Sequence, residues 1–260
     1  MLKLIASDVD GTLLQNGASA ISEQLFSCIN RLSDRGALFA VCSGRAYHDL
    51  RTMFAPVSDH VIFVSHDGAL VMYKERALMK LPVDPSAAKL FCSKAAAEKQ
   101  CSVFVSGKYI SYFQPESSEF SNMVRKNFHN HVVQIRELSE IHEDIYKLSV
   151  FSEQGLNDEL PFLNSYDKTQ LRLAYRDKQW REFVAAGVNK GSALAWVQRC
   201  FGIEKNETAA FGDNYNDLEM FDYAAFDYAV TNAKPEVLAR CAYRTESVES
   251  TLEKWLSRRE

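Results

Sequence analysis

The stretch Leu2–Leu13, LKLIASDVDGTL, joins a short apolar run to a pair of carboxylates. Residues 4–6 are the apolar run, and a run of this kind predicts a buried β-strand. Asp8 and Asp10 follow it, and Gly11 then interrupts the extended pattern. Carboxylates at positions i and i+2 where a strand ends can face the same cleft. The stretch therefore predicts a strand that ends in an acidic site.

This pair of carboxylates has several interpretations. Two ionised carboxylates held this close repel each other, and a bound cation removes the repulsion. Hard oxygen ligands of this kind suit Mg²⁺. A simple Asp/Gly turn after the strand is the plain alternative. A calcium-binding EF-hand loop is excluded, because it needs Gly at its sixth position and Glu at its twelfth, whereas Gly11 is fourth here and Ser19 is twelfth.

Composition places the chain among globular proteins. Its 260 residues can hold one large domain or two ordinary ones, and 47% apolar with 25% charged residues is typical of a soluble protein. The net charge of −4, with no Lys/Arg block, gives no support for nucleic-acid binding. Asp8 interrupts the first apolar stretch too early for a signal peptide, and no run approaches membrane-spanning length. We expect a cytoplasmic protein with no membrane association and no obligate protein partner.

The cysteines are scattered and form no CxxC pair. Most lie in apolar contexts, so we expect reduced, buried thiols. They are Cys28, Cys42, Cys92, Cys101, Cys200 and Cys241.

The first third of the chain alternates strands and helices. Ser22 and Gly36 are the expected cap and stop of a helix over residues 22–35. The pattern then predicts strands over 37–42 and 61–64, a helix over 46–54, and the turn Ser43-Gly44-Arg45 between strand and helix. This rhythm favours a parallel sheet covered by helices on both faces. Ligands in such folds bind beyond the carboxyl ends of the strands, where Asp8, Asp10 and Ser43 are expected.

The pattern changes after residue 68. Residues 70–81 alternate around a polar tip at residues 74–76, which predicts a hairpin. Strands then occur in pairs, which favours an antiparallel sheet with helices on one side. The expected helices span 86–100 and 118–127, and the expected strands span 102–106, 109–113, 145–151, 170–175 and 180–185. This segment has a globular composition and is predicted to be an inserted domain.

The strand-and-helix rhythm resumes after Gly187. Lys190 precedes a helix expected over 192–201, and residues 208–211 predict another apolar strand. The polar run GDNYND follows that strand over residues 212–217. A helix, a short strand around 226–230 and two further helices are expected to close the chain. Taken singly, Ser43-Gly44 is explained as a helix cap, Lys190 as a solvated lysine and GDNYND as a polar turn.

Taken together, these groups have the parts for phosphoryl transfer, which needs an in-line nucleophile, neutralisation of the phosphoryl oxygens and a proton for the leaving group. Asp8 can be the nucleophile, and Asp10 can protonate the leaving oxygen and then take a proton from water. Asp213, Asp8 and the backbone carbonyl of Asp10 can hold Mg²⁺. The remaining donors for the phosphoryl oxygens are Ser43, the Gly44 amide, Lys190 and Asn216. Asp217 then orients Lys190 or a metal-bound water.

Four segments together resemble the motifs of the haloacid dehalogenase (HAD) superfamily of phosphatases. In chain order they are DVDGTLL, Ser43-Gly44-Arg45, GVNKGSAL and GDNYND. The stretch VTNA over residues 230–233, followed by Pro235, resembles the tail signature of the Cof-like subgroup. The resemblance implies a Mg²⁺-dependent phosphatase with Asp8 as nucleophile and Asp10 as acid/base, and it places Thr12 with Asp217 in a supporting layer. Asp rather than Ser at position 10 favours a phosphatase over an ATPase.

The resemblance also implies the domain organisation. Residues 1–81 and 184–260 correspond to a Rossmann-like α/β core with a parallel sheet, and residues 82–183 to an inserted C2B-type α/β cap with an antiparallel sheet. One position departs from the subgroup, which commonly has Asn before Gly-Ala where this chain has His66-Asp67. We interpret Asp67 as a cap of the hairpin, with an effect on substrate charge preference as the alternative.

The expected reaction is hydrolysis of a small phosphorylated metabolite, with sugar phosphates as the first guess. The expected cap closes over that substrate and excludes water. A phosphomutase is one alternative, because related phosphomannomutases share a similar core and cap. A phosphate-binding regulator without turnover is another, although such a protein has no need for both Asp8 and Asp10. Phosphate release, as opposed to phosphate movement between hydroxyls of one sugar, distinguishes the first two.

Overall fold

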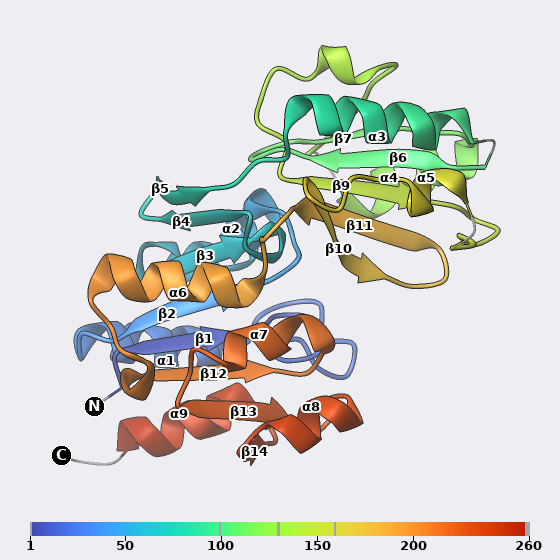
Figure 1. Ribbon diagram of the computed structural model, residues 1–260. Coiled ribbons are helices and arrows are strands. Elements are labelled where there is room, and N and C mark those ends of the chain that lie inside the picture. Colours follow the sequence, from blue (N-terminus) through green and yellow to red (C-terminus); the bar gives the residue numbers. More distant parts are fainter. Residues whose placement is uncertain (1, 99, 129–130, 159, 258–260) are drawn as a thin grey trace. The chain divides into compact units, whose positions relative to one another are not determined.

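The computed structural model describes residues 2–98, 100–128, 131–158 and 160–257. The chain divides into two compact units (Figure 1). The core unit contains the residues up to Lys80 and those from Asn189 onward. The inserted unit contains Leu81–Val188. The fold class is therefore α/β with an insertion, and each unit has its own sheet.

An eight-stranded sheet forms the centre of the core unit. In spatial order its strands are β14 (Tyr243–Thr245), β13 (Phe226–Val230), β12 (Thr208–Gly212), β1 (Leu4–Ser7), β2 (Leu38–Cys42), β3 (Val61–Ser65), β4 (Leu70–Tyr73) and β5 (Arg76–Lys80). The strands from β14 to β3 are parallel, and β4 and β5 continue the sheet as an antiparallel hairpin. The predicted parallel sheet and the predicted hairpin are both confirmed.

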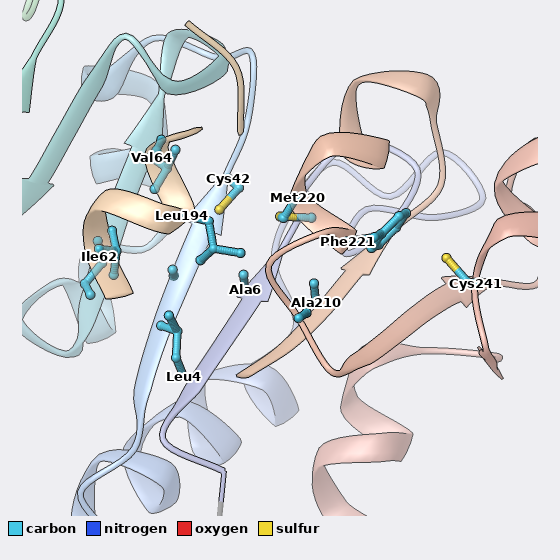
Figure 2. Close-up of a cluster of buried hydrophobic side chains, with 14 of the residues drawn as sticks. Leu4, Ala6, Cys42, Ile62, Val64, Leu194, Ala210, Met220, Phe221 and Cys241 are labelled. Atoms are coloured by element: carbon cyan, nitrogen blue, oxygen red, sulfur yellow. The ribbon is translucent and has the colours of Figure 1, made fainter. Parts of the chain in front are cut away.

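Helices cover both faces of this sheet, as the apolar strands predict. They are α1 (Glu23–Asp34), α2 (Tyr47–Met53), α6 (Lys190–Phe201), α7 (Leu218–Phe221), α8 (Pro235–Arg240) and α9 (Val248–Ser257). On one face, Leu194 of α6 and Met220 of α7 belong to the same buried cluster as Leu4 of β1 (Figure 2). On the other face, the Trp255 ring of α9 lies 5.9 Å from the Phe211 ring of β12. The central strands are thus buried on both sides.

The ends of α1 follow the signals in the sequence. The Ser22 hydroxyl accepts a hydrogen bond from the Leu25 backbone N–H at 3.2 Å, which satisfies one of the free donors at the helix start. Gly36 has a φ of 76°, a left-handed conformation that glycine adopts without strain. The predicted cap and stop of this helix are confirmed.

A six-stranded sheet forms the centre of the inserted unit. In spatial order its strands are β10 (Leu171–Arg176), β11 (Trp180–Ala185), β9 (Lys147–Phe151), β6 (Ser102–Ser106), β7 (Ser111–Gln114) and β8 (Val132–Gln134). Neighbouring strands are antiparallel except for β7 and β8, which are parallel. The predicted antiparallel sheet is confirmed for all but this edge strand.

The prediction that helices lie on one side of this sheet is wrong. Helix α3 (Pro85–Ala97) and the short α5 (Pro161–Asn164) pack with Val103 and Val105 of β6. Helix α4 (Ser118–Phe128) packs through Phe120 with Phe104, the residue between those two valines. Successive strand residues face opposite sides of a sheet, so α4 covers the other face. The reason is that β6 is apolar on both faces, a pattern that requires cover on both.

The elements that the sequence did not predict are short. They include the three-residue strands β8 and β14, the four-residue helix α5, and five 3₁₀ turns. These turns are η1 (Ala55–His60), η2 (His66–Gly68), η3 (Leu138–Glu140), η4 (Lys205–Glu207) and η5 (Tyr215–Asp217). Segments of three to six residues carry no measurable hydrophobic period, so their placement depends on tertiary contacts. The helix expected over 86–100 ends at Ala97, and residue 99 lies outside the described part of the chain.

All six cysteines are free thiols, and five of them are buried as expected. Cys200, near the end of α6, is exposed and corrects that expectation. Among the described residues, no helix combines the length and the apolar character needed to cross a membrane.

Candidate active site

The candidate residues are brought together by the ends of neighbouring strands. Asp8 directly follows β1, Ser43 follows β2, and Asp213 follows β12. Because β12, β1 and β2 are adjacent and parallel, their carboxyl ends meet at one edge of the sheet. Lys190 reaches the same place from the first turn of α6. Folds of this type bind ligands at this edge.

A buried ionic cluster lies at the centre of the site. The Lys190 ammonium donates to Asp8 Oδ1 at 2.5 Å and to Asp217 Oδ1 at 2.7 Å. The side chains of Lys190 and Asp217 are fully buried, and that of Asp8 is 8% exposed. Asp217 Oδ2 accepts hydrogen bonds from the backbone N–H groups of Asp213 and Asn214, at 2.9 and 3.0 Å. Both oxygens of Asp217 are therefore occupied, and in this structure Asp217 contacts Lys190.

Helix α6 starts two residues earlier than its sequence pattern predicts. Asn189 caps it: the Asn189 side chain accepts from the Ser192 backbone N–H at 2.7 Å, and Ser192 Oγ accepts from the Asn189 backbone N–H at 3.2 Å. This capping box makes Lys190 the first residue of the helix. The cap thus fixes the backbone from which the Lys190 side chain reaches Asp8.

Burial sets the electrostatics of this cluster. Burial raises the pKa of Asp8, since the loss of water outweighs the attraction of Lys190, and the charges of Asp217 and Asp213 raise it further. Burial also lowers the pKa of Lys190, but Asp217 and Asp8 together raise it well above its ordinary value. The pKa of Asp213 is raised by burial and by Asp217, against the Thr12 hydrogen bond that lowers it. The cluster therefore holds more carboxylates than Lys190 alone can neutralise.

The carboxylates fit a hard cation. Asp8, Asp213 and Asp217 each offer an oxygen within 4.8 Å of the others. Within the described residues, Asp8 Oδ2 is buried and accepts no hydrogen bond, so it is available to a ligand. Thr12 Oγ1 donates to Asp213 Oδ1 at 2.9 Å and orients that carboxylate. Carboxylate oxygens of this kind are the ligands that Mg²⁺ prefers.

Gly11 allows Asp213 to approach the loop after β1. Its φ is 93°, and a Cβ at this position would collide with the Asp213 carboxylate. Asn232 donates to the Gly11 carbonyl at 2.8 Å, which holds the loop from the segment after β13. The Asp-x-Asp-Gly order therefore has a steric reason in this fold.

Asp10 lies outside the buried cluster. Its carboxylate accepts two parallel hydrogen bonds from the Arg45 guanidinium, at 2.8 Å from Nε and 2.7 Å from Nη2. The Asp10 side chain is 53% exposed and that of Arg45 is 39% exposed. Arg45, named only as part of a motif in the sequence, is thus the residue that holds the candidate acid/base.

The expected phosphate donors surround a further carboxylate. Ser43 is buried, and its hydroxyl accepts from the Arg45 backbone N–H at 3.2 Å. Asn216 donates from Nδ2 to Asp67 Oδ1 at 3.2 Å, and a Cβ on Gly44 would lie 3.1 Å from Asp67 Oδ2. Asp67 therefore contacts Asn216, one of the expected phosphate donors. The expectation that Asp67 caps the hairpin does not include this contact. The departure of Asp67 from the subgroup pattern was the only signal in the sequence.

Comparisons with known proteins identify the family and several relatives of this chain. A family model described as haloacid dehalogenase-like hydrolase matches residues 5–251. The Escherichia coli (strain K12) protein YbjI, described as 5-amino-6-(5-phospho-D-ribitylamino)uracil phosphatase, is 23% identical over 95% of this chain and 91% of its own length. A crystal structure from Eubacterium rectale is 29% identical, with a TM-score of 0.89 over 98% of this chain and 99% of that one.

A structure described as the HAD subclass IIB sugar phosphatase BT4131 has the same fold. Its TM-score is 0.77 at 18% identity, over 97% of this chain and 98% of that one.

Proposed function

We propose, because this chain belongs to the haloacid dehalogenase-like hydrolase family, that it hydrolyses small phosphomonoesters through a phosphoryl group carried on Asp8. The enzyme class is that of its relatives, a phosphoric monoester hydrolase. The observation that carries the proposal is the environment of Asp8. One oxygen of this buried carboxylate is bound by Lys190, and the other accepts no hydrogen bond from any described residue.

Asp8 is placed to act as the nucleophile. Lys190 fixes the carboxylate through Oδ1, which leaves Oδ2 to attack the phosphorus atom. As the new O–P bond forms, the bond between phosphorus and the leaving alcohol oxygen breaks. Water then attacks the same phosphorus and the bond to Asp8 breaks, which restores the carboxylate and releases phosphate. Two steps with a covalent intermediate replace one harder step.

Asp10 supplies the proton transfers in this scheme. It protonates the leaving alcohol oxygen in the first step and takes a proton from the attacking water in the second. Its exposed position leaves it accessible to both groups. The bidentate contact with Arg45 fixes the orientation of the carboxylate. For the first step, Asp10 must either separate from Arg45 or contact Arg45 and the substrate at the same time.

The remaining groups bind the phosphoryl oxygens and a cation. Asp8, Asp213 and the backbone carbonyl of Asp10 would hold Mg²⁺, which when bound neutralises charge on the phosphoryl group. Ser43, the Gly44 amide, Lys190 and Asn216 donate to the other oxygens. Asp217 keeps Lys190 in place, because its second oxygen is already held by two backbone N–H groups.

The names of the relatives narrow the substrate class. YbjI is described as acting on a phosphorylated ribityl compound, and BT4131 as a sugar phosphatase. Both descriptions name a phosphomonoester on a chain or ring rich in hydroxyl groups. We therefore propose a phosphorylated polyhydroxy metabolite, such as a sugar phosphate, as the substrate of this chain.

Phosphate release across a panel of substrates tests the proposal. The panel contains sugar phosphates, polyol phosphates, nucleotides and cofactor phosphates, each measured with Mg²⁺ and with a chelator. We expect metal-dependent release, strongest from the polyhydroxy compounds. Asp213→Asn should need a higher Mg²⁺ concentration for the same activity, because it removes a proposed Mg²⁺ ligand. Transfer of phosphate between hydroxyls of one sugar, without release, would instead indicate a mutase. If the folded protein releases no phosphate from any compound of the panel, the proposed hydrolysis is contradicted.

A further inference from the structure

The turn after β3 holds two non-glycine residues in a left-handed backbone conformation. His66 has a φ of 52° and Asp67 a φ of 56°. Side chains other than glycine rarely adopt this conformation, and it persists where the surroundings impose it, often at functional sites. The Asp67 backbone N–H donates to the Ser43 carbonyl at 3.0 Å. The turn therefore fixes Asp67 against the loop that follows β2.

The side chain of Asp67 is buried among the proposed phosphate donors. Its Oδ1 accepts from Asn216 Nδ2 at 3.2 Å, and its Oδ2 lies 3.1 Å from the position that a Cβ on Gly44 would occupy. Burial lowers the pKa of Lys190, and Asp67 is among the carboxylates that raise it. Three of the four proposed phosphate donors thus have Asp67 as a neighbour.

One oxygen of Asp67 is left without a partner. Asp67 is 3% exposed, and within the described ranges its Oδ2 has no hydrogen-bond donor. The other buried carboxylate oxygen in this state, among the described residues, is Asp8 Oδ2, the proposed attacking atom. Buried polar atoms in native proteins are normally paired. A buried acceptor without a donor, beside a binding site, points to a donor that arrives with the ligand.

We propose that Asp67 is a specificity-determining residue, whose free carboxylate oxygen accepts a hydrogen bond from an O–H group of the bound substrate. This inference rests on the proposed phosphatase reaction. A bare phosphoryl oxygen has no proton and would repel Asp67, so the pocket discriminates against ligands that bring no donor. An asparagine at this position would turn the acceptor into an amide N–H donor and remove that discrimination.

Two parts of a substrate can carry this O–H group. One is the phosphoryl group itself in its singly protonated form, whose proton is lost with a pKa near 6 in phosphomonoesters. The other is a hydroxyl of the leaving group close to the phosphate. Both supply the same chemistry, an O–H donor, and they differ in their response to pH and to the structure of the leaving group.

The phosphoryl source is tested with methyl phosphate, which has no hydroxyl other than that of its phosphoryl group. The measurement is kcat/KM of the wild type and of Asp67→Asn between pH 5 and pH 7. If the phosphoryl proton is the donor, the ratio of wild type to variant falls about tenfold over this range, because the monoanion fraction falls by about that factor. Lys190, the charged group whose pKa Asp67 raises, and the adjacent His66 are present in both proteins.

The leaving-group source is tested with a pair of similar esters. Glycerol 2-phosphate carries two hydroxyls, and isopropyl phosphate has the same carbon skeleton without them. If a hydroxyl is the donor, Asp67→Asn loses about tenfold in kcat/KM with the glycerol ester at every pH, the loss expected for one hydrogen bond to a charged group. The isopropyl ester, which brings no hydroxyl, then shows no such loss.

The control variant is Asp49→Asn. Asp49 on α2 is a nearby carboxylate whose charge acts on Arg45, and its Oδ1 lies 3.1 Å from His48 Nδ1. We expect its ratio to the wild type to be independent of pH and of the ester used. A folded Asp67→Asn that matches the wild type with methyl phosphate and with both longer esters at every pH would overturn the proposal. An equal loss with all substrates at all pH values would do the same, because it would make the role of Asp67 purely structural.

A failure of the phosphatase proposal gives a different result. In that case the wild type itself releases no phosphate from any ester. Binding of methyl phosphate and the two longer esters, measured by calorimetry with wild type and Asp67→Asn, then still reports on Asp67. The expected signs are the same as for kcat/KM, and unchanged affinities would count against the role of Asp67 independently of catalysis.

Discussion

The two units of this chain bury charged side chains in different ways. In the inserted unit, each buried cation has a carboxylate that reaches water: Lys147 pairs with Glu182 at 2.8 Å, and Arg181 pairs with Asp158 at 2.7 Å. Glu182 is 22% exposed and Asp158 is 63% exposed. In the core unit, Lys190 is fully buried and faces the carboxylates of Asp8 and Asp217, with Asp213 and Asp67 beside them.

This difference separates structural pairs from a reactive site. Pairing a cation with a partly hydrated carboxylate costs little free energy, so such a pair can be present without a functional role. A surplus of buried carboxylates is costly, because each must be dehydrated without a matching positive charge. Such surpluses are typical of sites where a cation or an anionic substrate completes the charge balance. The comparison predicts that substitutions in the core cluster change chemistry, whereas those in the inserted unit change stability alone.

The largest expected effect is that of Asp8→Asn. The amide cannot form the phosphoryl intermediate, and loss of a nucleophile of this kind lowers kcat by about 10⁴-fold or more. The side chain keeps its size, and the protein should remain folded by circular dichroism. Phosphate release from the best substrate of the panel is the measurement. Normal turnover by this variant would refute the assignment of Asp8.

Asp10→Asn comes next, with an expected loss of about 10²–10⁴-fold in kcat, the usual range for general acid–base catalysis. Asp10 is exposed and paired with Arg45, so folding should be almost unaffected. Single-turnover experiments with an alkyl phosphate, whose leaving alcohol oxygen needs a proton, separate the two steps. Both steps should slow, and a loss confined to one of them would argue against the dual role of Asp10.

Lys190→Met tests the core cluster as an element of stability. It leaves Asp8 and Asp217 buried without their cation, and breaking a buried pair in this way costs about 3–5 kcal/mol. The matched change in the inserted unit is Lys147→Met, where Glu182 can be rehydrated, and about 1–2 kcal/mol is expected. Urea unfolding followed by circular dichroism measures both. Equal losses would remove the distinction between the two units.

The fold was readable from the sequence where apolar runs are long. The parallel strands β1, β2 and β3 follow from apolar runs, and the hairpin after them follows from the alternation of residues 70–81 around a polar tip. The side of the inserted sheet on which α4 packs was not readable. Strand β6 is apolar on both faces, and only the contacts of Phe120 decide which helix covers which face.

The candidate site, like the fold, could be predicted from the sequence only in part. Asp8, Ser43 and Asp213 sit at strand ends, and parallel topology brings strand ends together. Asp67 and Asn216 are 149 residues apart in sequence, and their contact has no local signature. The hydrogen bond from Arg45 to Asp10, which are 35 residues apart in sequence, likewise has no local signature. Local patterns thus predict which residues reach the site, whereas their pairing depends on side-chain geometry.

The smallest expected effect is a pH dependence in the inserted unit. The Arg181 hydrogen bond and its charge lower the pKa of Asp158 from its ordinary value of 3.8. A carboxyl with a lowered pKa in the folded state stabilises the protein above its unfolded pKa, and this stabilisation is lost as pH falls through the folded pKa. Asp158→Asn should therefore be less stable than the wild type near pH 7 and equally stable at about pH 2–3.

Urea unfolding at pH 7, 4 and about 2.5 measures this difference, which high salt should reduce because Asp158 is exposed. A gap between the two proteins that persists at the lowest pH would mean that Asp158 acts through packing or through neutral hydrogen bonds. Charge pairing would then stabilise the inserted unit less than its structure indicates. The comparison between the two units would depend on the Lys190→Met result alone.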